Sequence, residues 1–142
     1  MADSGSASID IDAAPEEIID VVTDIESYPT WMPAFQEAQI LERDGEGRPS
    51  KAKFQVDARL KVVNYTLQYS YEEKKISWEK TEGDVKEIKG SYTLAPQGSG
   101  TKVTYDYSID PGFPVPGFLR RQGVKMMVSS ALEDLKKRVE SS

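Results

Sequence analysis

Residues 61–71, KVVNYTLQYSY, decide the fold class because their polarity alternates along most of the segment. One set of side chains is apolar or aromatic and consists of Val63, Tyr65, Leu67, Tyr69 and Tyr71. The intervening side chains from 64 to 70 are polar. Because successive side chains of a strand point to opposite faces, this period of two predicts a strand with one face in a core and one in water.

The same period extends to both sides of this segment. Further strands are predicted for SASIDID (6–12), FQEAQILE (35–42), KAKFQVDARL (51–60), KISWEKT (75–81), EIKGSYTL (87–94) and KVTYDYSID (102–110). The clusters RDGEGRP (43–49) and APQGSGTK (95–102) are typical of turns. No connection between the strands has room for a crossover helix, so we expect an antiparallel meander of about seven strands with one apolar face.

Two segments have helical spacing instead. APEEIIDVVTDIESY (14–28) begins with a proline at a first-turn position and carries an apolar stripe at 18, 21, 22 and 25. From Phe118 to Glu140 a longer stripe consists of Val124, Met127, Val128, Ala131, Leu132, Leu135 and Val139. We therefore predict an α+β fold in which a curved sheet wraps around a long C-terminal helix and short N-terminal helices close one end. One domain, 1–142, is expected, with 1–6 and 140–142 frayed.

The composition argues against several kinds of site. The 142 residues contain no Cys and no His, which removes disulfides, the commonest metal ligand and the commonest general base. The net charge of −6 argues against a nucleic-acid partner. We expect no metal, no cofactor and no catalytic residue. No stretch is long enough to span a membrane, and MADSGSASIDID (1–12) lacks the features of a secretory signal, so a cytoplasmic protein is expected.

The segment YPTWMPAF (28–35) combines two prolines with three aromatic residues. Proline should keep it from forming regular helix or central strand. Such an apolar loop has two interpretations. It could plug the core beneath the first helix, or it could form the rim of a pocket.

Three quoted stretches resemble one family. IDAAPEEIIDVVTDIESYPTWMP (11–33), GSYTLAPQGSGTKVTYDYSIDP (90–111) and the proline-rich run PGFPVPGFL (111–119) resemble corresponding parts of the START-like helix-grip superfamily. The resemblance covers nearly the whole chain, and the nearest branches are the polyketide cyclase/dehydrase group and the coenzyme Q-binding group. It implies a cavity between the sheet and the long helix, with 28–35 and the proline-rich run near its ends. It specifies the fold far better than the function.

The predicted inner face is rich in tyrosine. Six tyrosines lie on the same side of their predicted strands as Trp78: Tyr65, Tyr69, Tyr71, Tyr92, Tyr105 and Tyr107. A dry core seldom uses so many hydroxyls, so the set indicates a small-molecule cavity with polar points, although hydroxyls at strand ends could simply reach water. We expect the lining to consist of Trp31, Phe35, Phe54, Tyr69, Trp78, Tyr92, Tyr107, Phe118, Gln122 and Met126.

The first functional hypothesis is that this cavity binds a small, largely apolar molecule, such as a lipid, an isoprenoid or an aromatic polyketide, for carriage or presentation. An alternative is a polyketide cyclase or aromatase, in which a tyrosine, Arg59 or Lys80 would have to act. A second alternative is a docking protein for a partner. Residues 118–140 carry six basic and three acidic side chains, which could give transient contact with an anionic membrane or form an ordinary solvated face. The sequence does not indicate an oligomeric state.

Overall fold

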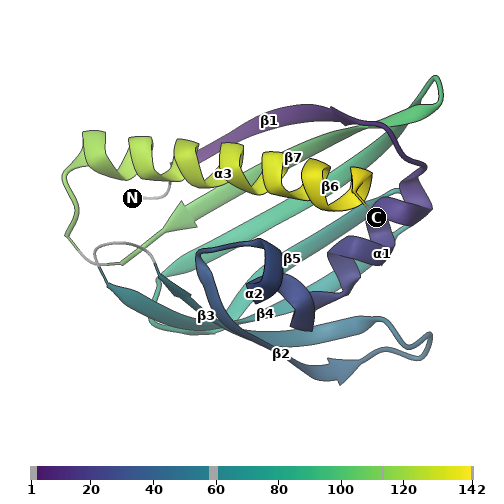
Figure 1. Ribbon diagram of the computed structural model, residues 1–142. Coiled ribbons are helices and arrows are strands. Elements are labelled where there is room, and N and C mark those ends of the chain that lie inside the picture. The colour runs from purple at the N-terminus through teal and green to yellow at the C-terminus, as the bar shows by residue number, and fades with distance from the viewer. Residues whose placement is uncertain (1–2, 58–60, 113, 142) are drawn as a thin grey trace.

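The computed structural model describes residues 3–57, 61–112 and 114–141. These form one seven-stranded antiparallel sheet in the order β1-β7-β6-β5-β4-β3-β2, with helices on one side of it (Figure 1). The strands are β1 (Asp3–Ile11), β2 (Phe35–Arg43), β3 (Pro49–Asp57), β4 (Val62–Glu72), β5 (Lys75–Gly83), β6 (Glu87–Gln97) and β7 (Gly100–Asp110). The helices are α1 (Pro15–Thr23), α2 (Tyr28–Trp31) and α3 (Gly117–Glu140). The predicted helix-grip architecture is confirmed.

The strands largely follow the predicted alternation, except that Thr66 of β4, predicted on the water-facing side, is buried. In β4, Val63, Leu67 and Tyr69 are buried, and Tyr69 pairs with Trp78 of β5. β2 to β7 form the meander, and β1 adds to its end by pairing with β7. The chain start differs from expectation, because residues 3–6 pair with 106–109 of β7 instead of fraying. The predicted strand end at 58–60 lies outside the described residues.

The N-terminal helical region is divided. α1 ends at Thr23, a 3₁₀ turn covers Ile25–Ser27, and α2 follows directly. Half of the segment 28–35 is therefore helical, contrary to our expectation. Pro29 permits this because it occupies the first turn of α2, where a missing N–H costs no hydrogen bond. The buried hydroxyl of Tyr28 donates to the carbonyl of Val22 and ties α2 to α1.

α3 covers the concave side of the sheet and packs against β1, β7 and α1 (Figure 1). Its C-terminal half buries one stripe, formed by Val128, Leu132, Leu135 and Val139. Lys136 Nζ donates to the carbonyl of Asp10 at 2.6 Å, which fastens this half to β1. Val124 and Ala131 are half-buried. Met127, predicted in the same stripe, is instead 41% exposed.

Candidate functional site

Aromatic rings form two connected groups between the sheet and the helices. The first group consists of Tyr28, Trp31, Phe35, Phe54 and Tyr65. The second group consists of Tyr69, Trp78, Tyr92, Tyr105 and Tyr107. In the second group, ring centroids lie 5.1 Å apart for Trp78 and Tyr92 and 4.9 Å apart for Tyr92 and Tyr105, both edge-to-face. This geometry is favourable for aromatic pairs, so the concave face is a largely apolar surface of fixed shape.

Several tyrosine hydroxyls on this surface, those of Tyr69, Tyr92 and Tyr105 among them, have no hydrogen-bond partner among the described residues. Tyr71 donates to the carbonyl of Pro49 at 2.5 Å, but the described residues offer no hydrogen bond to the hydroxyls of Tyr69, Tyr92 and Tyr105. Every fully buried side-chain nitrogen or oxygen in the described part of the chain does have a partner. These three hydroxyls must therefore border space that a water molecule can enter. They are polar points on an apolar wall.

Burial raises the pKa of these three phenols above its ordinary value, and neighbouring tyrosines add a smaller effect. The phenols of Tyr69, Tyr92 and Tyr105 consequently stay protonated at neutral pH. In that form they can donate a hydrogen bond to an acceptor on a bound molecule. They are poor proton acceptors, so this surface suits orientation of a ligand better than general-base chemistry.

The sheet splits between β5 and β6. Their pairing ends at Glu79 and Lys89, after which β5 continues along β4 as far as Gly83 and β6 stays with β7. Gly83 is required here because its φ is +135° and a Cβ would lie 2.5 Å from the Asn64 carbonyl oxygen. The split holds an open cleft of about 660 Å³. The cleft is lined by Glu79, Lys80, Lys86, Glu87, Ile88, Lys89 and Asp110.

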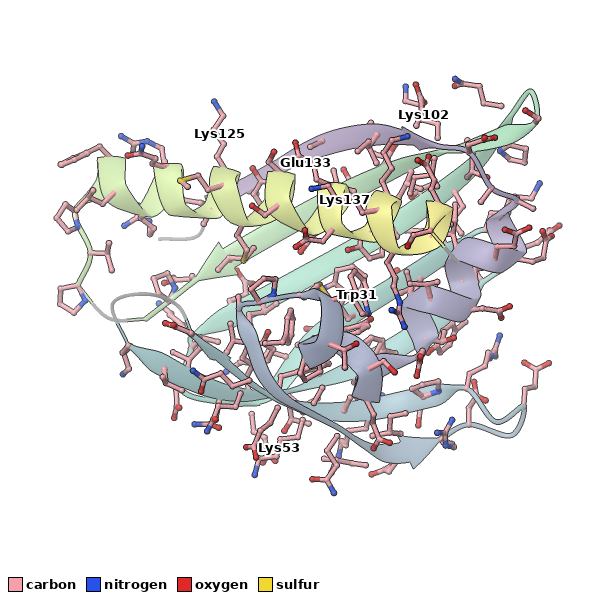
Figure 2. The ribbon with its side chains drawn as sticks, viewed as in Figure 1. Trp31, Lys53, Lys102, Lys125, Glu133 and Lys137 are labelled. Atoms are coloured by element: carbon pink, nitrogen blue, oxygen red, sulfur yellow. The ribbon has the colours of Figure 1, made fainter. Side chains whose placement is uncertain are left out.

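A smaller groove lies near the C-terminal end of α3. It measures about 210 Å³ and is lined by Trp31 together with Asp134, Lys137, Arg138 and Ser141. Figure 2 shows Trp31 between α2 and the C-terminal half of α3. The interpretation of the segment 28–35 as a core plug is confirmed for part of it, and the interpretation as the rim of the cavity stays a prediction. Tyr28 and Met32 are buried in the core, whereas Trp31 is half-buried and reaches the groove.

The structure brings most of the predicted lining residues together. Phe54 and Tyr69 are buried in the core, and the half-buried members that pack against it are Trp31, Phe35, Trp78, Tyr92 and Tyr107. Three helix residues are exposed instead, namely Phe118, Gln122 and Met126. Met126 is 48% exposed because a helix turns about 100° per residue, which places it about 200° from the buried Val128.

The cleft between β5 and β6 was missed by sequence reasoning. The signal in the sequence was the connection between β5 and β6. It follows Gly83 and is longer than a two-residue hairpin turn. Metal sites were not expected, and within the described ranges no group of three His, Cys, Asp or Glu side chains could hold a metal ion. No helix among the described residues is both long and apolar enough to cross a bilayer.

Comparisons with known proteins agree with this architecture. The sequence profile described as polyketide cyclase/dehydrase and lipid transport matches residues 3–140. No match was found among curated proteins. A START superfamily protein from Mycobacterium smegmatis is 25% identical over 97% of both chains, with a TM-score of 0.89.

Two more distant structures share the fold. The Zhui aromatase/cyclase from Streptomyces sp. R1128 is 15% identical, with a TM-score of 0.79 over 99% of this chain and 94% of its own. A STAR-related lipid transfer protein from Xanthomonas axonopodis is 18% identical, with a TM-score of 0.78 over 96% of this chain and 85% of its own. At such identities the likeness concerns the fold alone.

Proposed function

Because this chain belongs to the polyketide cyclase/dehydrase and lipid transport family, we propose that it binds one small, largely apolar molecule between the concave face of its sheet and α3. The molecule would be a lipid, an isoprenoid or an aromatic polyketide, held for carriage or presentation. Burial of its apolar surface would supply most of the affinity, at roughly 25 cal/mol per Å².

The observation that carries this proposal is that the hydroxyls of Tyr69, Tyr92 and Tyr105 have no hydrogen bond to any described residue. A core that served only stability would be expected to pair such groups or to use aliphatic side chains in their place. Donors that border a space beside aromatic rings are the usual composition of a small-molecule site. Trp78 and Phe35 would supply ring surface for the guest.

The first test is native mass spectrometry of the protein purified from its own cell extract, followed by denaturing release of any passenger. We expect a stoichiometric apolar compound. The second test is a fluorescence titration with N-phenyl-1-naphthylamine, a neutral apolar probe. Saturable binding with one site is the expected result, and the absence of both a passenger and probe binding would refute the proposal.

A matched pair of variants locates the probe. Ala131 of α3 is half-buried against the core, while its neighbour Ser130 is exposed. Ala131→Phe should fill space beneath the helix and weaken probe binding about tenfold, whereas Ser130→Phe should leave the dissociation constant unchanged. Equal effects of the two variants would mean that the probe binds elsewhere.

A further inference from the structure

β5 carries a lysine on the apolar face of the sheet. Lys80 follows Trp78 by two residues and pairs with Leu67 of β4, which is 5% exposed. Side chains that pair directly across two strands share a face, so Lys80 belongs to the concave side, where it is half-buried. A lysine in this position is unusual, because the neighbouring side chains that point to the concave face are apolar or aromatic.

The other two lysines of the cleft between β5 and β6 have carboxylates nearby. Lys86 Nζ lies 3.9 Å from a carboxylate oxygen of Asp110. Lys89 Nζ lies 3.9 Å from carboxylate oxygens of both Glu79 and Glu87. The cleft therefore holds three carboxylates and three lysines, and each carboxylate lies near Lys86 or Lys89 rather than near Lys80.

Lys80 has no such partner in the described ranges 3–57, 61–112 and 114–141. An ammonium group that is partly withdrawn from water without an anion loses solvation that nothing in the fold restores. Among the described residues, no carboxylate lies within ion-pair distance of the Lys80 ammonium.

The split in the sheet gives this charge access to a ligand. β5 has left β6 before Lys80 is reached, so the open cleft lies directly beside its side chain, with Ile88 on the other wall. The aromatic group that begins at Trp78 is the neighbouring part of the same face. An apolar surface that ends in one unpaired cation is complementary to an amphiphilic molecule with an anionic end.

We propose that the ligand carries one acidic group, such as a carboxylate, which binds the ammonium of Lys80 while its apolar body lies on the aromatic face. This inference rests on the proposed function, because it specifies the class of ligand for the same site. It distinguishes amphiphilic acids from neutral lipids and neutral aromatic compounds.

Two probes with the same rings test the charge directly. N-Phenyl-1-naphthylamine is neutral, and 8-anilino-1-naphthalenesulfonate adds one sulfonate to that skeleton. We expect the wild-type protein to bind the sulfonate more tightly than the neutral probe. Lys80→Met should weaken binding of the sulfonate about tenfold and leave that of the neutral probe within twofold, because methionine keeps an apolar stem.

The matched control is Lys53→Met on β3. Lys53 is exposed and extends away from α3 (Figure 2), so this variant removes the same charge without touching the concave face. It should alter neither dissociation constant. Thermal unfolding of Lys80→Met should match or exceed that of the wild type, since it places an apolar side chain on an apolar face.

The outcomes separate the two proposals. If both probes bind and Lys80→Met changes neither affinity, the proposed apolar binding site is supported, and the proposal that Lys80 binds an acidic group is wrong. If Lys53→Met weakens sulfonate binding as much as Lys80→Met, the effect is one of net charge and the inference is also wrong. If neither probe binds the wild type, the proposed function fails, and this inference fails with it.

Discussion

At Gly90 the absence of a side chain allows Trp78 to lie across the sheet. The two residues pair directly between β5 and β6. A Cβ at position 90 would lie 2.6 Å from Nε1 of the indole, which is closer than non-bonded atoms tolerate. The sequence predicted Trp78 on the inner face, but only the structure explains why the residue that pairs with it is glycine. Gly90 fixes the orientation of the ring at the centre of the aromatic group.

Gly90→Ala should therefore displace Trp78. We expect the free energy of unfolding to fall by about 1–3 kcal/mol through overpacking, measured by urea denaturation. The emission of Trp78 should shift to longer wavelength in a Trp31→Phe background. A stability equal to that of the parent would show that the indole has room to move.

Gly123→Ala is the matched control for this change. Gly123 lies within α3, and a Cβ there would meet nothing within 4 Å. Alanine is the better helix former, so this variant should gain about 0.5–1 kcal/mol. Opposite signs for the two glycine substitutions are the expected result.

At the scale of elements, α3 consists of two unlike halves. Its C-terminal half buries an apolar stripe and is fastened to β1, whereas its N-terminal half exposes large apolar side chains. The exposed members are Phe118, Leu119, Met126 and Met127. At the start of the helix, an ion pair of 2.5 Å joins Arg120 to Asp3 of β1. The stability of α3 should therefore come mainly from its second half.

Leucine substitutions in the two halves test this difference. Leu135 is 1% exposed and Leu119 is 45% exposed. Leu135→Ala should cost about 2–5 kcal/mol because it leaves a cavity in the core. Leu119→Ala should cost less than about 0.5 kcal/mol. Comparable losses in urea denaturation would contradict the division of the helix.

For the whole molecule, the density of buried phenols sets a limit at alkaline pH. Burial raises the pKa of six tyrosines in the folded state: Tyr28, Tyr65, Tyr69, Tyr71, Tyr92 and Tyr105. For Tyr71 the pKa rises to about 12. The folded state thus holds these protons more tightly than the unfolded chain, where the pKa of tyrosine is about 10.

The resulting stability is fully present below pH of about 10 and is lost as the pH rises through the folded values. We expect the free energy of unfolding to decrease steeply between about pH 10 and pH 12. Tyrosinate absorbance at 295 nm should increase together with the loss of far-ultraviolet circular dichroism. Most of the tyrosinate signal appearing while the fold is intact would contradict the burial of these side chains.

The sequence alone determined the features that depend on local periodicity. Alternation with a period of two identified the strands and their apolar face, and helical spacing identified α3 and the burial of Val128, Leu132, Leu135 and Val139. These patterns are set by backbone geometry within one element, so a single chain segment reveals them. The α+β architecture followed because an apolar sheet face and an apolar helix stripe each need a cover.

Only the tertiary structure decided how these elements meet. The rotation of α3 turned Met126 outward, and the separation of β5 from β6 opened the cleft. The register between β4 and β5 set Lys80 beside Leu67, where no carboxylate of the described residues pairs with it. Each of these depends on contacts between segments distant in the sequence, which periodicity within one segment does not encode. The fold was therefore predictable from local patterns, while the charge and opening of the candidate site arose from packing.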